Sequence, residues 1–102
     1  MTDPRLLLLS PQDNILVARE PIPAGEAVIV EDDKVVLATL LDRGHKIARQ
    51  AISVGDKILK YGAPIGSATH AIRVGEPVHI HNIKSDYTAT HVIAKPTSEA
   101  NP

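Results

Sequence analysis

Several residue types are missing from this chain of 102 residues, and each absence narrows what the chain can do. There is no cysteine, which excludes disulfides, thiolate zinc sites and cysteine nucleophiles, and allows a reducing compartment. There is no phenylalanine or tryptophan, and only Tyr61 and Tyr87 carry a phenol ring. Because Val, Ile, Leu and Ala must then fill the core, we expect thin layers and short strands rather than a large interior.

Charge excludes another class of partner. The formal net charge is −1 at pH 7, and the basic residues form no stripe. Without stacking aromatics or a basic surface, the sequence predicts no binding of nucleic acid.

The length predicts one domain with irregular ends. We expect a lead-in over residues 1–12, a domain over residues 13–94 and a flexible tail over residues 95–102. The apolar run at residues 6–9 is too short to cross a bilayer or to form a signal-peptide core, so we expect an early strand or a docking arm. We therefore expect no membrane association, and a soluble, cytoplasmic protein.

The pattern of apolar residues predicts a mostly β domain. Strands are expected at residues 14–19, 28–30 and 35–38, with a polar hairpin turn between the last two. Residues 39–43 are the one place where a short helical turn is expected. From Ile58 onward, glycine or proline falls every few residues, which is too often for a sustained helix.

One turn sequence occurs three times, in the form Ile-x-x-Gly-acid-x-aliphatic. The copies are Ile22 to Val28, Ile52 to Ile58 and Ile72 to Val78. Glycine can reverse the chain, while the aliphatic residues point inward and the acid faces water. The repetition predicts short strands that fold back on one another, with Glu26, Asp56 and Glu76 as solvated turn residues rather than a catalytic set.

Two histidines stand close together in residues 78–82. If this segment is a strand, His79 and His81 lie on one face and Val78 and Ile80 on the other. Such a pair can bind a metal, hold a carboxylate or move a proton near neutral pH. The alternative is a solvent-facing strand without a function for its histidines, because two histidines without other ligands are a weak metal signal.

Two further places combine glycine with polar side chains. His45 and Lys46 follow Gly44, and would offer a donor and a cation to an anionic substrate, or form an ordinary surface turn. Near Gly62, residues 60–66 predict a tightly turned loop. The ring of Tyr61 is expected to cap the core with its hydroxyl left free.

The order of these motifs is similar to that of a known family. They follow one another as Gly44-His45-Lys46-Ile47-Ala48, the turn at Gly55, Lys60-Tyr61-Gly62-x-Pro64-Ile65-Gly66-x-Ala68-Thr69, the turn at Gly75-Glu76, and Val78-His79-x-His81-Asn82. The set resembles the small SAF-type β-clip domain of the altronate and galactarate dehydratase family, over about residues 13–82. One departure is Asp42, where members of that family often have proline.

The resemblance implies a chemistry and a partner. Members eliminate water, or sulfite in the sulfolactate sulfo-lyase branch, from a hydroxy acid next to its carboxylate. They are thought to use a divalent metal, usually Fe(II), which a large subunit or domain would mainly hold. The SAF-type part either precedes a large catalytic domain or is a separate small subunit. A chain of 102 residues is expected to be the latter, and self-association stays open.

The resemblance also implies roles for particular residues. Catalytic roles are expected for His45, His79 and His81, and His79 and His81 are the candidate metal ligands. Substrate binding is expected for the remaining matched positions, Lys46, Tyr61, Gly62 and Asn82. The alternative hypotheses are a non-catalytic β-clip module that binds a small acid or a partner surface, and a purely structural domain.

Overall fold

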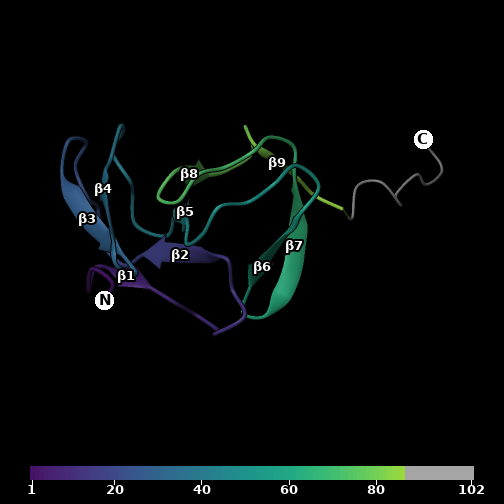
Figure 1. Cartoon of the computed structure of the whole chain (residues 1–102), viewed down its shortest axis with the longest axis horizontal. Helices are drawn as coiled ribbons and strands as arrows, with labels where there is room; N and C mark the ends of the chain where they lie inside the picture. The colour runs from purple at the N-terminus through teal and green to yellow at the C-terminus, as the bar shows by residue number, and fades with distance from the viewer. Residues whose placement is uncertain (87–102) are drawn as a thin grey trace.

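The computed structural model describes residues 1–86, and within that range it contains nine strands and no helix. The strands, shown in Figure 1, are β1 Leu6–Leu7, β2 Ile15–Ala18, β3 Ala27–Val30, β4 Asp33–Val36, β5 Lys46–Ala48, β6 Lys57–Lys60, β7 Ala63–Ala68, β8 Pro77–Val78 and β9 Ile83–Lys84. The prediction of a mostly β fold of short strands is confirmed. The predicted tail, residues 95–102, lies outside the described residues.

A central antiparallel sheet separates two small cores. Its strand order is β1-β2-β5-β8. Leu16 and Ala18 of β2 enter a first hydrophobic cluster, to which the β3–β4 hairpin contributes. Ile15, the preceding residue, enters a second cluster, which β6, β7 and Ile83 of β9 complete. Figure 1 shows β2, β5 and β8 between these two outer units. Successive side chains of β2 point to opposite faces of the sheet and so enter two different thin cores. Thin cores are expected for a chain without Phe or Trp.

Three local predictions need correction. The helical turn expected at residues 39–43 is wrong, because Leu41 is buried and extended, and its N–H and C=O both bond to Ile22. The polar hairpin turn is shorter than expected, since Asp33 and Lys34 already belong to β4. Residues 1–12 are not wholly irregular, because the early strand expected within residues 6–9 is present as β1, which pairs with β2, and Leu6 lies in the first cluster.

The repeated turn occurs four times rather than three. In the predicted copies the acid donates its N–H to the carbonyl three residues earlier, at 3.0–3.3 Å. His45 does the same to Asp42, at 3.0 Å. The glycine in front of each of these four donors has a φ between 82° and 89°, which is the requirement of a type II turn. The fourth copy does not match the sequence pattern of the other three, because leucine replaces isoleucine and His45 replaces the acid.

A buried carboxylate holds the β6–β7 hairpin in place. Tyr61 and Gly62 form its two-residue turn, with φ values of 57° and 75°, as a type I′ turn requires. The two oxygens of Asp13 accept the N–H groups of Tyr61 and Gly62, at 3.0 and 2.7 Å. Asp13 is only 1% exposed. Positive φ at a tyrosine costs about 1–2 kcal/mol, and these hydrogen bonds offset it.

Replacing Asp13 should therefore destabilise the hairpin. In Asp13→Ala the two turn N–H groups lose their partner, and a hydrogen bond to a charged group contributes about 1.5–3 kcal/mol. We expect the free energy of unfolding to fall by about 3 kcal/mol, measured by urea denaturation. The matched control is Asp32→Ala, because Asp32 is a fully exposed turn residue, and it should change stability by less than about 0.5 kcal/mol. Equal losses in the two variants would contradict the role given to Asp13.

Candidate functional site

His45 is set apart from the acids that occupy the same turn position. The carboxylates of Asp56 and Glu76 accept the N–H of the first turn residue, Ser53 at 2.9 Å and Arg73 at 2.6 Å. In the remaining acidic copy that residue is proline, and Glu26 instead pairs with Arg5 at 2.7 Å. The side chain of His45 makes no such bond among the described residues, and it is exposed. It is therefore available to an outside ligand.

The imidazole of His45 stacks on that of His79. The two ring centroids are 5.5 Å apart and the ring planes differ by 17°. The contact follows from strand register, because Lys46 of β5 pairs with Val78 of β8, so the residues just before and just after them are neighbours. Two exposed histidines separated by 34 positions in sequence thus form one edge. The sequence predicted both residues but not their contact.

The segment that holds His79 is a turn, so its predicted strand geometry is wrong. Strand β8 ends at Val78, and the N–H groups of Asn82 and Ile83 both donate to the carbonyl of His79, at 3.0 and 3.1 Å. The side chain of Asn82 accepts the N–H of His79 at 3.0 Å and donates to the carbonyl of Pro77 at 2.8 Å. Asparagine competes with strand pairing in this way.

The turn therefore places the side chains of His79, His81 and Asn82 differently from a strand. His79 and His81 do not share a strand face, and Asn82 is 93% buried, being 7% exposed. Asn82, predicted to bind substrate, has its side-chain oxygen and nitrogen bonded to the turn itself. We therefore assign it to positioning the turn. At the apex stands Ile80, which is 81% exposed between the two histidines.

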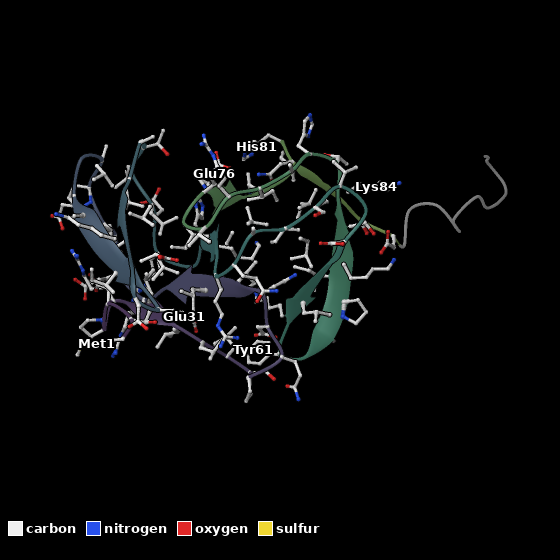
Figure 2. All side chains as sticks on the ribbon, viewed as in Figure 1. Met1, Glu31, Tyr61, Glu76, His81 and Lys84 are labelled. Carbon is white, nitrogen blue, oxygen red and sulfur yellow. The ribbon has the colours of Figure 1, made fainter. Side chains whose placement is uncertain are left out.

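A shallow hollow lies beside this turn. It has a volume of about 230 Å³ and is lined by His70, Ala71, Glu76, Pro77, His81 and Asn82. Figure 2 shows Glu76 and His81 on the same side of the molecule. His70 is exposed and lines the same hollow as His81. No sequence signal marks this pairing, because it depends on how two turns meet.

Tyr61 and Gly62 lie elsewhere. The expectation that the Tyr61 ring caps the core is wrong, since the residue is 70% exposed at the tip of the β6–β7 hairpin. Residues 64–66, expected to continue a loop, belong to β7. Figure 2 places Tyr61 on the side of the molecule opposite to His81. The predicted site residues therefore form two separate groups on this chain.

Lys46 points away from the histidine edge. Its cross-strand partners are Val17 and Val78, which pack in or against the second cluster, so its side chain leaves the sheet on the face of that cluster. Partial burial lowers the pKa of Lys46, and the positive charge of Lys60 lowers it further.

The described residues do not form a complete metal site. Within residues 1–86 there is no group of three or more His, Asp or Glu side chains that could hold an ion. A divalent metal held by this chain alone does not fit the residues described, although His79 and His81 are free to add ligands to a site built elsewhere.

No helix of residues 1–86 is long and apolar enough to cross a membrane.

Fold and edge together define a class: a small, all-β clip-like domain that presents histidines from two of its turns. Residues 4–86 match the altronate/galactarate dehydratase SAF domain, and the chain belongs to this family. The resemblance predicted from the motif order is thereby confirmed. The match also includes β1, which the predicted domain boundary at residue 13 left out.

Named relatives fall into two kinds. The altronate dehydratase of Bacillus subtilis is 38% identical over 92 residues, which cover 89% of this chain but 18% of that protein. The altronate dehydratase of Escherichia coli K12 is 39% identical over 74 residues, which cover 72% of this chain and 15% of that protein. The (2R)-sulfolactate sulfo-lyase subunit alpha of Chromohalobacter salexigens is 30% identical over 76 residues, which cover 69% of this chain and 81% of that subunit. This chain is thus a lyase-associated SAF domain that spans less than a fifth of the altronate dehydratases.

Proposed function

We propose that this chain is the small subunit of a hydroxy-acid lyase and completes an active site that a large catalytic subunit mainly builds. The observation that supports the proposal is the likeness to a protein named as a subunit. The chain is 30% identical to the (2R)-sulfolactate sulfo-lyase subunit alpha over 76 residues, which cover 81% of that subunit. The reaction would be that of a sugar-acid dehydratase of the altronate or galactarate type, or of a sulfolactate sulfo-lyase.

The exposed histidine edge supports this role. Elimination removes a proton from the carbon next to the carboxylate and expels water or sulfite from the following carbon, and the enol formed becomes a 2-keto acid. Imidazole can accept that proton or donate one to a departing hydroxyl near neutral pH. His45, His79 and His81 are exposed and free to reach a substrate held by a partner. A partner is required because the hollow of about 230 Å³ beside His81 is too small and open to enclose a sugar acid.

In this proposal the divalent metal is held mainly by the large subunit. Fe(II) or another divalent ion would polarise the substrate's oxygens and stabilise developing enolate charge. Because residues 1–86 offer no group of three ligands, we assign the ion mainly to the large subunit. The chain's own part is to position the acid and to move protons through its histidines.

A second candidate is a β-clip module that binds a partner surface without taking part in chemistry. Ile80 favours it, since a residue 81% exposed at a turn apex is a natural anchor for a protein interface. The two candidates differ in what the histidines do once the complex has formed.

Mixing experiments test the leading proposal. The isolated chain should show no dehydration of altronate or galactarate and no release of sulfite from sulfolactate. Activity should appear when it is mixed with a candidate large catalytic subunit and supplied with Fe(II). Product formation is followed as 2-keto acid or sulfite. A large subunit with equal activity in the absence of this chain would contradict the proposal.

A further inference from the structure

The hollow beside His81 is small, and most of the residues that line it are polar. Its volume is about 230 Å³, and its lining residues are His70, Ala71, Glu76, Pro77, His81 and Asn82. The proposed proton transfer does not require the side chains of His70, Glu76 or Asn82. The hydrogen-bonding groups that these side chains offer indicate which ligand the hollow fits.

Glu76 gives the hollow a fixed negative charge. One of its carboxylate oxygens accepts the N–H of Arg73 at 2.6 Å, which holds the side chain in its turn. Apart from the two histidines, Glu76 is the one titratable residue within residues 1–86 that lines this hollow, because Arg73 lines a separate hollow beside β4. A carboxylate can only accept hydrogen bonds, so it can pair with a hydroxyl of a ligand but repels a second anion.

Asn82 gives the hollow a buried donor. Its Oδ1 accepts the N–H of His79 at 3.0 Å, and its Nδ2 donates to the carbonyl of Pro77 at 2.8 Å. An amide nitrogen carries two hydrogens, so one donor stays unpaired within residues 1–86 on a residue that is 7% exposed. Buried donors in proteins are normally paired, and an oxygen of a ligand in the hollow can serve as the partner.

His70 and His81 add imidazoles from two separate loops. Nδ1 of His70 lies 2.9 Å from Oγ1 of Thr69, which leaves Nε2 for a ligand. The N–H of Thr69 donates to the carbonyl of Asn82 at 2.8 Å, so backbone bonding holds the two loops together. A neutral imidazole has one donor and one acceptor nitrogen, and so has the same two abilities as a hydroxyl group.

We propose that this hollow is a subsite for the uncharged, hydroxylated end of a sugar acid, and that Glu76 selects for an acid with only one charged end. Hydroxyls both donate and accept hydrogen bonds, which suits a carboxylate acceptor, an amide donor and two imidazoles. A carboxylate or sulfonate at that end has no hydrogen to donate to Glu76 and meets its negative charge. The subsite therefore favours altronate over galactarate, which is a diacid, and over sulfolactate, which ends in a sulfonate.

The position of the subsite agrees with proton transfer at the stacked histidines. Residues 77–82 carry both His79 of the stack and His81 of the hollow, and the side chain of Asn82 bonds to His79 while it lines the hollow. An extended sugar acid can place the carbon next to its carboxylate at the stack and its far hydroxyls in the hollow. The identity of the acid rests on the proposed function, whereas the subsite rests on the hollow and the groups that line it.

The test is a titration of the full chain with altronate and with galactarate, at neutral pH and constant ionic strength, in which the histidine ring signals are followed by NMR. We expect the His70 and His81 signals to shift along one saturating curve with altronate. The affinity for galactarate should be about tenfold weaker, the effect of like charges in contact near a water-exposed surface. Glu76→Gln should remove most of this difference, because the amide oxygen can still accept the N–H of Arg73 while the charge is lost.

Asp56→Asn is the matched control. Asp56 has the same place in its own turn, accepts the N–H of Ser53 at 2.9 Å and does not line the hollow. This variant loses the same charge and should keep the preference for altronate. A second variant, His70→Ala, should weaken the affinity for altronate about fivefold, the effect of one hydrogen bond, as measured on the His81 signal.

Two results would overturn the proposal. One is a preference between the two acids that is the same in Glu76→Gln as in the unaltered chain. The other is the absence of any saturable shift at His70 and His81. The titration measures binding without turnover, so it can fail while mixing with a large subunit yields an active lyase, and the reverse also holds.

Discussion

Gly75→Ala should destabilise the domain by about 4 kcal/mol, far more than alanine at another glycine of the same turn family. Gly75 has a φ of 82°, where an L side chain costs about 1–2 kcal/mol. A Cβ at this position would also lie 2.9 Å from the Cβ of Val35 and 2.7 Å from its Cγ2. Valine is stiff about χ1, so relief requires β4 or the turn to move, and overpacking of this kind costs about 1–3 kcal/mol.

Gly55→Ala is the matched control, because the backbone is the same and the surroundings differ. Gly55 has a φ of 89°, but a Cβ there would meet nothing within 4 Å. It should show the conformational cost alone, about 1–2 kcal/mol. Both values follow from urea unfolding of the full chain at 25 °C, with the m-value checked for a common two-state transition. Losses that agree within error would show that Val35 does not contact the Gly75 turn.

The comparison matters for function because the Gly75 turn leads into the histidine edge. Glu76 follows the glycine, then β8, then His79. Val74 and Val35 pack together against the first cluster, so the turn ties the outer hairpin to the strand that presents His79. A shift here should move His79 relative to His45. Gly75→Ala is therefore expected to lower the activity of the proposed lyase complex as well as the stability of the domain.

Much of this framework could be predicted from the sequence because it is local. Strand β2, the β3–β4 hairpin and three of the turns follow from alternating apolar residues and well-placed glycines. The fourth turn could also have been predicted, because Leu41 to Ile47 has the same spacing once leucine is allowed at the first position and any polar residue after the glycine. That relaxed pattern would have shown His45 in the place of an acid.

The remaining features depend on contacts between distant residues. The φ of 57° at Tyr61 is held by Asp13, 48 positions earlier, and no local pattern predicts such a partner. The bend after Val78 depends on the side chain of Asn82, which was assigned to substrate instead. The family resemblance named the candidate site residues, but only register brings His45 against His79.

Replacing either stacked histidine should abolish most turnover without unfolding the chain. General acid–base catalysis contributes about 10²–10⁴-fold, so under the proposed function His45→Ala and His79→Ala should each lower kcat/KM of the lyase complex by about 10²-fold or more. Both residues are exposed, so unfolding free energies should change by less than about 0.5 kcal/mol. Asp33→Ala on β4 is the control, as an exposed residue on the outer hairpin, and should keep full activity.

The stack adds a test that separates catalysis from docking. If His45 and His79 act as one unit, the double variant should lose little more than either single variant, because the second change removes what the first has already disabled. The change should fall on kcat and on the pH profile, while the affinity of this chain for the large subunit stays the same. If affinity falls and kcat at saturating small subunit is kept, the edge is a docking surface, and the binding-module hypothesis replaces the catalytic one.

Ile80→Ala should lower the affinity for the large subunit and keep kcat under both hypotheses, since the exposed side chain of Ile80 can offer only apolar contact.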